Sequence, residues 1–355
     1  MSNNELAPSV AKLVSPWDHN QNTVLLATSL SLQRNIEKFK FPGKMTPDRR
    51  QQVVSITSKG LTDSGALDQA VLLKGDEISP LDKEYLMEHF LSLQSFQHAH
   101  VGEGFVVDNT GTFIASFNLN NHIHFTQLDT ENDLEKAWNT LVKIESTLGE
   151  DLGYAFSPKF GFLTADPHQC GTGFNVSAFL QLPALAQTNE LEPLIRKLQD
   201  DQLIVTGIQG SPTEIIGDVI VIQNNYTLGI TEDNILSTIR SAITKVQVQE
   251  NAIRLKLKEQ DKPEIKDHVA RAYAVLVHSY QIETIEALNN ISLLKLGVDL
   301  GWISGITTAE LNHLFFSCRR AHLLGKISSS ILPEELSHKR AEHIHKALTK
   351  ITLGI

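Results

Sequence analysis

The chain has 355 residues, of which 41% are hydrophobic and 20% charged, and its formal net charge is −10. This composition is typical of a globular protein with one large and one smaller domain, and the negative charge argues against a general nucleic-acid or anionic-membrane binder. Two cysteines, Cys170 and Cys318, are too few for a zinc cluster or a disulfide framework. We see no membrane-helix stretch of roughly 18 apolar residues and no signal peptide, so we expect a cytoplasmic protein.

The first part of the chain mixes strand and helix patterns. Residues 23–32 predict an apolar strand, and residues 80–93 predict an amphipathic helix. Residues 104–128 carry two strand patterns around Asn109-Thr110-Gly111, which is a good hairpin signal. The apolar residues after this turn predict a single second strand over residues 114–128.

Two predicted helices, residues 133–148 and 191–198, flank the stretch 161–183, GFLTADPHQCGTGFNVSAFLQLP. This stretch predicts two strands joined by a glycine-punctuated loop at Gly171-Thr172-Gly173. Such a loop lets the backbone approach a phosphate, but a hairpin without a ligand is the simpler interpretation of the loop alone. Further strands and a loop are predicted over residues 203–229.

The last part of the chain is predicted to be helical. Thr231 is placed to cap a long helix whose apolar side chains recur from residue 236 to residue 257. The polar stretch 256–263 marks a boundary, and residues 264–355 contain few strand signals. We expect four or five helices in this final segment.

Short motifs recur along the chain in a fixed order. In the stretch 161–183 they comprise Gly161, Phe162, Leu163, Thr164, Pro167, Gly171, Thr172, Ser177, Leu182 and Pro183. Others are Ser15-Pro16-Trp17, Asn118, His122, Gly207, Gly210, Thr213, Glu214, Gly217 and the segments 271–273, 296–301 and 308–324. Together they resemble the phosphagen (guanidino) kinase family, and within it the bacterial protein arginine kinases. The resemblance implies an α+β fold, with an antiparallel sheet flanked by helices in residues 1–260 and an all-helical, dimerising domain in residues 261–355.

The resemblance also implies where a nucleotide would bind, because the family holds the phosphates with arginines. At the matching positions this chain has Ser29, Ser31, His124, Asn175 and Thr206. Gln209 stands where one branch of the family has a further arginine, and His89 stands at a basic helix position, where we expect a surface histidine. Arg34 is retained, and we expect a surface cation or a structural ion pair there rather than a ligand contact.

The residues that would hold and deprotonate the guanidinium group are also changed. Asn120 replaces the central glutamate, and an amide cannot act as a base at neutral pH. Asp166 replaces the family's cysteine, whereas Glu214 and His122 match the family's carboxylate and histidine. Asp166 together with Glu214 is suited to hold a guanidinium group, although a turn-capping role for Asp166 is the simpler interpretation.

The helical segment departs from the family's phosphoarginine-binding motif as well. Arg340 and Ala341 match the end of that motif, whereas Leu336 and Ser337 replace its leading arginine and aspartate. Arg340 is therefore a candidate phosphoarginine-binding residue, although an exposed cation on an amphipathic helix is the simpler interpretation.

These substitutions lead to three hypotheses about function. Each lost charge-assisted hydrogen bond is worth about 1.5–3 kcal/mol, and a lost general base costs on the order of 10²–10⁴ in rate. The leading hypothesis is an inactive pseudokinase without metal or cofactor, acting through a protein partner such as an activator, a Clp-type protease component or a second copy in a homodimer. The alternatives are a divergent active protein arginine kinase using Mg-ATP with Glu214, Asp166, His122 and His124, and a module that binds arginine or phosphoarginine.

Overall fold

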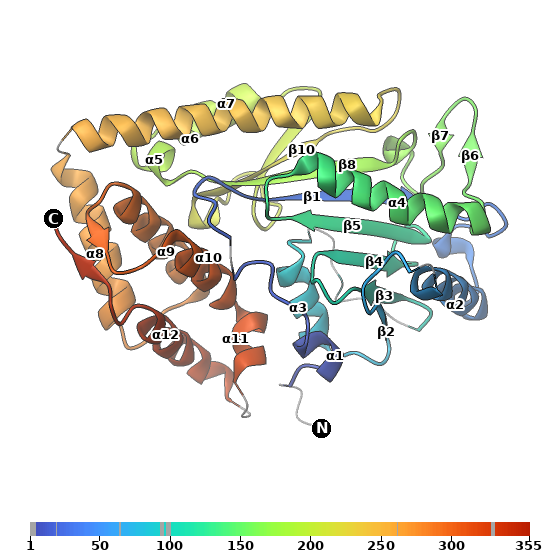
Figure 1. Ribbon diagram of the computed structural model, residues 1–355, viewed down its shortest axis with the longest axis horizontal. Helices are drawn as coiled ribbons and strands as arrows, with labels where there is room; N and C mark the ends of the chain where they lie inside the picture. Colours follow the sequence, from blue (N-terminus) through green and yellow to red (C-terminus); the bar gives the residue numbers. More distant parts are fainter. Residues whose placement is uncertain are drawn as a thin grey trace.

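An eight-stranded antiparallel sheet, in the order β2-β3-β4-β5-β1-β8-β10-β9, forms the centre of the molecule (Figure 1). The computed structural model describes residues 5–18, 20–63, 65–92, 96, 101–260, 262–327 and 331–355. The strands of the sheet are β1 (Leu25–Arg34), β2 (Val71–Lys74), β3 (Gly104–Val107), β4 (Phe113–Phe117), β5 (Ile123–Asp129), β8 (Phe174–Gln181), β9 (Leu203–Gly207) and β10 (Val219–Asn224). Two small sheets pair β6 (Phe156–Ser157) with β7 (Gly161–Phe162) and β11 (Ile303–Ser304) with β12 (Thr352–Leu353).

The first face of the sheet is covered by long amphipathic helices. These helices are α2 (Pro47–Asp63), α4 (Leu134–Leu152), α6 (Leu191–Leu198) and α7 (Glu232–Glu259). Figure 1 shows α4 and α7 lying along this face. Asp133 caps α4 and Thr231 caps α7 through side-chain oxygens that accept a backbone N–H, which supports the predicted starts of both helices.

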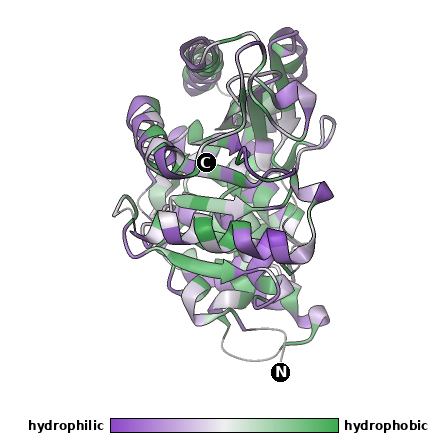
Figure 2. Cartoon of the chain, turned by 90° about the vertical axis from the view of Figure 1, so that its right-hand side faces the viewer, coloured by the Kyte–Doolittle hydropathy of each residue, from purple (hydrophilic) through white to green (hydrophobic). Residues whose placement is uncertain are grey.

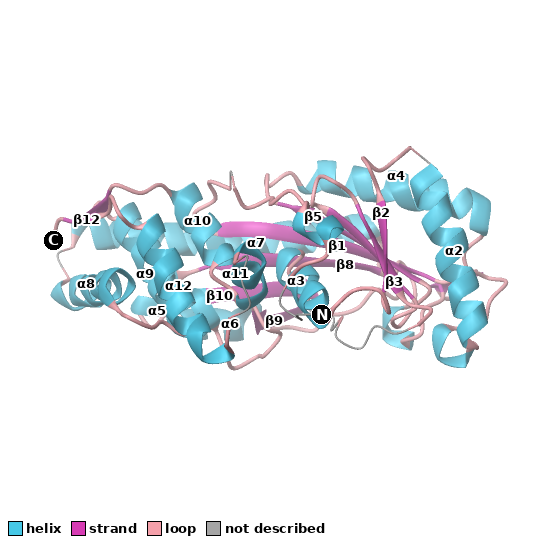
Figure 3. Ribbon diagram, turned by 90° about the horizontal axis from the view of Figure 1, so that it is seen from below, coloured by secondary structure: helices cyan, strands magenta, loops and turns pink. Residues whose placement is uncertain are grey.

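The second face of the sheet is apolar at one end and polar at the other. Its apolar end shares a core with α8 (Pro263–His278), α9 (Thr284–Asp299), α10 (Thr308–Ser317) and α12 (Leu336–Ala347), and α11 (Arg320–Lys326) follows α10 in the chain. These helices gather toward one end of the molecule, and the sheet extends toward the other (Figure 3). The core they share with the sheet includes Phe179, Val221 and Phe315. The helical nature of the final segment is therefore confirmed, and the division of the chain at residue 260 stays a prediction.

Shorter helices complete the fold. They are α1 (Pro8–Ala11), α3 (Pro80–His89) and α5 (Pro183–Gln187), with 3₁₀ turns η1 (Pro42–Lys44), η2 (Pro167–Gln169), η3 (Ile216–Asp218) and η4 (Pro333–Glu335). Helices α1, α3 and α11 enclose a third core with β2 and β3. Figure 2 shows hydrophobic residues concentrated on the strands and hydrophilic residues on the outer turns of the helices. None of the helices that the structure describes has the length and hydropathy of a membrane-spanning segment.

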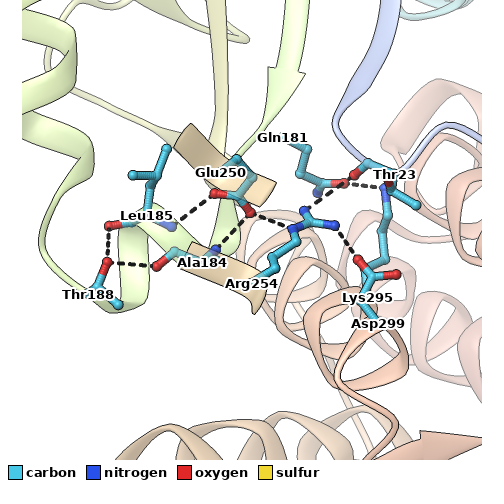
Figure 4. A network of polar contacts seen from close by, with 9 residues as sticks. All are labelled: Thr23, Gln181, Ala184, Leu185, Thr188, Glu250, Arg254, Lys295 and Asp299. Atoms are coloured by element: carbon cyan, nitrogen blue, oxygen red, sulfur yellow. Dashed lines mark hydrogen bonds and ion pairs between the residues drawn. The ribbon is translucent and has the colours of Figure 1, made fainter. Parts of the chain in front are cut away.

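A buried ion pair anchors the long helix α7 to its neighbours (Figure 4). Glu250 is fully buried, and its carboxylate accepts the backbone N–H groups of Ala184 and Leu185 at 3.0 and 2.9 Å. Arg254 donates to the same carboxylate at 2.8 Å and pairs with Asp299 of α9. The carboxylate therefore satisfies two free N–H groups at the start of α5 and connects three helices.

A buried lysine lies beside this ion pair. Lys295 donates to the side-chain oxygens of Gln181 and Asn312, both at 2.5 Å. Burial lowers the pKa of Lys295 to about 7. Gln181 belongs to β8 and Asn312 to α10, so Lys295 connects the sheet with two helices of the final segment.

Two predicted features of the strands are wrong. Residues 114–128 form two antiparallel strands, β4 and β5, instead of one. Asn118 turns the chain with a φ of 58°, its N–H bonds the carbonyl of His122 at 3.1 Å, and its amide donates to the carbonyls of Arg50 and Gly102. The hairpin expected within residues 161–183 is also absent, because β7 pairs with β6 whereas β8 pairs with β1 and β10.

Candidate functional site

A cleft of about 690 Å³ opens on the polar end of the second sheet face. We refer to it as the cleft. It is lined by β1, β5, β8 and β10, by the turn after β4 and by the loop before β8. The cleft brings together six residues that the sequence singled out: Ser29, Ser31, Asn120, His124, Asp166 and Asn175.

Strand alternation explains why these residues meet. On β1, Leu30 and Leu32 point into the core of the first face, so Ser29 and Ser31 point into the cleft. Across the sheet, Ser31 lies opposite Asn175 and Thr126, and Ser29 lies opposite Ser177. The register therefore places hydroxyl and amide groups side by side over neighbouring strands.

The floor of the cleft extends beyond the predicted residues. The neighbouring side chains Gln33, Thr126, Ser177 and Gln223 belong to it and were not predicted as site residues from the sequence. All four occupy strand positions of the same alternation as Ser29, Ser31, His124 and Asn175. That alternation, applied to every predicted strand, is the sequence signal that identifies them.

The cleft has almost no charge. None of the described residues that line it is an arginine or a lysine, and Asp166 is the one acidic residue among them. The residues outside the described ranges include no arginine or lysine either. Burial lowers the pKa of His124 to about 4, so its imidazole is neutral at pH 7.

Arg34, the cation retained next to the cleft, has a structural role. Its Nε bonds Glu145 at 2.6 Å, and its Nη1 donates to the carbonyls of Gln33 and Thr172, both at 2.9 Å. The guanidinium group also stacks on Phe162, 3.6 Å from the ring centroid. Arg34 is only 3% exposed, so the predicted structural ion pair is confirmed and the surface cation is wrong.

The two carboxylates expected to hold a guanidinium group are not brought together. Asp166 lines the cleft, but its Oδ1 accepts the N–H of His168 at 3.0 Å, so it also caps its turn as predicted. Glu214 is exposed on the loop between β9 and β10 and does not belong to the cleft lining. Its neighbours in the loop, Ser211 and Thr213, organise a polar turn that faces water.

Two of the predicted histidines serve the fold. His122 is fully buried, accepts the N–H of Ile36 at 2.9 Å through Nδ1 and donates to the carbonyl of Lys40 at 2.8 Å through Nε2. His89 is also fully buried, so its predicted surface position is wrong. Its Nε2 bonds the carbonyl of Gly111 at 2.8 Å, and burial lowers its pKa to about 3. A neutral, enclosed imidazole cannot contact a phosphate.

Thr206 and Gln209 lie away from the cleft. Thr206 occupies β9 opposite Val221, and its hydroxyl is buried. Gln209 is exposed and lines a separate cavity beside α3. Neither residue belongs to the lining of the cleft.

Arg340 has a structural role that its sequence position did not indicate. It is 1% exposed, so the expected exposed cation is wrong. Its Nε donates to the carbonyl of Cys318 at 2.9 Å, and its Nη1 donates to the carbonyl of Ile282 at 2.8 Å. The side chain therefore satisfies the C-terminal end of α10 and joins it to the start of α9.

The cleft does not fit a magnesium–nucleotide complex. Among the described residues, no group of three or more His, Cys, Asp or Glu side chains is arranged to hold a metal ion. A triphosphate brings about four negative charges, which proteins neutralise with cations and Mg²⁺. The lining offers uncharged hydrogen-bonding groups and one carboxylate instead.

Comparisons with known proteins match two family models. A model described as "ATP:guanido phosphotransferase, C-terminal catalytic domain" matches residues 52–253. A model described as "Protein-arginine kinase McsB C-terminal domain" matches residues 262–353. The two matches follow one another along the chain.

Similar proteins and solved structures agree with these models. A protein-arginine kinase of Chlamydia pneumoniae is 32% identical over 334 residues, covering 93% of this chain and 92% of that protein. One from Halothermothrix orenii is 31% identical over 96% of this chain and 98% of that protein. The crystal structure of a lombricine kinase aligns with a TM-score of 0.57 and 20% identity, over 71% of this chain and 72% of that chain, which shows a shared fold.

Proposed function

Because this chain belongs to the ATP:guanido phosphotransferase family, we propose that it is a catalytically inactive member that acts as a scaffold or regulatory interaction protein. One observation carries the proposal: the cleft, where four of the five positions that match the family's phosphate-binding arginines meet, has no lining arginine or lysine in the described chain. Without such cations, a bound triphosphate would lose its water without gaining an opposite charge.

The replacement of the family's catalytic glutamate by Asn120 also supports an inactive protein. Asn120 is exposed at the rim of the cleft, and its amide cannot take a proton from a guanidinium group at neutral pH. Glu214, the carboxylate that matches the family, is exposed to water outside the cleft. The partners that such a protein would serve include an activator, a Clp-type protease component or a second copy of the chain.

The direct test is Mg-ATP binding by the purified protein, measured by calorimetry and thermal shift. We expect no heat of binding and no shift of the melting temperature. In parallel, mass spectrometry under conditions that preserve the P–N bond should detect no phosphoarginine on a protein substrate. Micromolar ATP affinity accompanied by phosphoarginine would refute the proposal.

A restoration experiment makes a negative result informative. Ser31 and Asn175 lie opposite one another across β1 and β8, so the double variant Ser31→Arg/Asn175→Arg places two cations side by side in the cleft. We expect this variant to gain measurable ATP binding. The matched control Val248→Arg/Leu255→Arg adds the same charge to exposed positions of α7 and should gain none.

An active but divergent kinase is the first alternative, and the names of the similar proteins favour it. It requires a carboxylate to act on the guanidinium group. If phosphoarginine does form, Glu214→Ala should abolish it under this alternative. Activity that survives this substitution would exclude the role assigned to Glu214.

An arginine-binding module is the second alternative, because Asp166 presents a carboxylate in the cleft. Calorimetry with free arginine and with phosphoarginine distinguishes the two ligands. Binding of arginine that is lost in Asp166→Asn would favour this alternative. If neither ligand gives a heat of binding, the arginine-binding alternative is excluded.

A further inference from the structure

A second cavity of about 470 Å³ lies beside the cleft, and we refer to it as the groove. It is enclosed by α3, by the loop after β9 and by the first turns of α9 and α11. Its walls include the aliphatic side chains Met87, Ile208, Ile285 and Leu288. Ile285 is 45% exposed, so the groove presents apolar surface to water.

The groove is lined by two carboxylates and two guanidinium groups whose formal charges cancel, and Arg319 donates to the backbone carbonyls of Phe316 and Glu88. Glu84 pairs with Arg320. Glu88 bonds His322 at 2.8 Å and accepts the N–H groups of Ala321 and His322 at 3.2 and 3.1 Å. A ligand with a strong net charge would therefore find no net counter-charge in the groove.

The cleft and the groove are adjacent. Leu91 and Ser92 line both of them, directly after the end of α3. Leu91 holds a φ of 49°, a left-handed conformation that is unusual for this residue type. One ligand can therefore reach both cavities across this single turn of chain.

The floor of the cleft carries hydroxyl groups that the fold does not use. The side chains of Ser29, Ser31, Thr126 and Ser177 make no hydrogen bond with the part of the chain that the structure describes. A hydroxyl both donates and accepts, so a row of them complements an uncharged ligand that also carries alternating donors and acceptors. The amide groups of a polypeptide have this property, whereas phosphates do not.

We propose that the cleft and the groove together bind one extended, uncharged polypeptide segment of a partner protein. Its backbone and side-chain amides bond the hydroxyl groups of the cleft, and one apolar side chain enters the groove beside Ile285. This inference deepens the proposed function, on which it rests, by stating the chemistry of the partner segment. It predicts recognition through one apolar anchor and neutral neighbours, because the single carboxylate of the cleft, Asp166, already accepts the N–H of His168 at 3.0 Å.

The probe is a set of fluorescein-labelled dodecapeptides composed of Gly, Ser, Thr, Asn and Gln, each with one fixed Leu, Phe, Asp or Lys. Binding is measured by fluorescence anisotropy with the full chain. We expect the Leu or Phe peptides to bind and the Asp and Lys peptides to bind at least about tenfold more weakly, since burying an unpaired charge is costly. Absence of binding by every Leu and Phe peptide, or preference for Asp or Lys, would overturn the proposal.

Two substitutions test the groove. Ile285→Asp introduces a charge at the groove wall on an exposed helix position, and we expect roughly thirtyfold weaker binding, as for a hot-spot residue. Leu255→Asp is the matched control, because Leu255 is an exposed aliphatic residue of a helix outside the groove. Equal affinity of the two variants would contradict a groove anchor.

The contribution of the cleft is tested by the variant Ser31→Asp. The variant Asn120→Asp, at an exposed residue of the rim, replaces it if Ser31→Asp reduces folding.

If one peptide spans both cavities, combining a cleft variant with Ile285→Asp should weaken binding by less than the product of the separate effects, because neighbouring contacts on one ligand are coupled. If neither cleft variant changes the peptide affinity, the peptide does not contact the cleft and that part of the proposal is overturned. If the protein binds ATP, the proposed function is refuted, and the peptide affinity is unaffected by that result. If the protein binds neither ATP nor any of the peptides, only this inference is refuted.

Discussion

One face of strand β8 passes through two chemically opposite regions. Asn175 and Ser177 face the cleft, whose floor is neutral, whereas Gln181 faces the buried network of Glu250, Arg254 and Lys295. The chain therefore has charged residues where they connect helices, whereas no arginine or lysine is found among the described residues that line the cleft. The two regions therefore differ in local charge although they lie along the same strand.

The comparison predicts that substitutions in the buried network are far more costly than substitutions in the cleft. Glu250→Ala should have the largest effect, because it leaves two buried N–H groups unbonded and weakens the pairing of Arg254. Breaking a buried ion pair costs about 3–5 kcal/mol of unfolding free energy. Urea denaturation measures the loss, with the exposed Glu259→Ala on the same helix as control. A loss below that of the control would contradict the anchoring role.

Arg34→Ala should have the next largest effect. It removes the ion-pair partner of Glu145 and two hydrogen bonds to backbone carbonyls, and we expect a loss of about 2–4 kcal/mol. The exposed pair of Arg196 and Glu192 provides the control, since Arg196→Ala should cost less than about 1 kcal/mol. If the two substitutions cost the same, Arg34 is not the structural cation described above.

Lys295 should make stability depend on pH. Its pKa is about 7 in the folded chain and about 10.4 in an unfolded one, so between these values the unfolded state binds more protons. Stability should therefore rise as pH increases from about 7 to about 10, by at most about 1.4 kcal/mol per pH unit. Lys295→Met should flatten this slope in urea denaturation measured across the range. An unchanged slope would show that other groups cause it.

Single alanine substitutions in the cleft should have the smallest effect. Ser29→Ala and Ser177→Ala remove hydroxyls without a partner in the described chain, so unfolding free energy should change by less than about 0.5 kcal/mol. Thermal and urea unfolding provide the measurement. A loss comparable to that of Arg34→Ala would mean that the cleft is part of the structural framework, and the contrast between the regions would fail.

Much of the fold follows from local patterns in the sequence. The cap at Thr231 and the apolar repeat predicted α7, and the turn at Asn109-Thr110-Gly111 predicted the hairpin of β3 and β4. The turn at residues 118–121 was missed because its polar residues continue a period that also suits a strand. The left-handed conformation of Asn118 depends on contacts with Arg50 and Gly102, which are distant in sequence.

The site was predictable where regular strands present it and not elsewhere. Ser29, Ser31, His124 and Asn175 meet because alternation and register fix their direction. Glu214 lies on an irregular loop, where no period determines which way a side chain points. The burial of His89 and Arg340 depends on helices packed over them from other parts of the chain, which helical periodicity alone does not reveal.

The strand order has a consequence for how the chain folds during synthesis. Strand β1 lies between β5 and β8, so its second edge stays open until the ribosome has produced Phe174–Gln181. Until then the nascent chain presents an unpaired strand, which is a common starting point for aggregation. Such distant pairing also slows folding, because a long loop must close first. Truncated products that end before β8 should therefore be the species most in need of a chaperone.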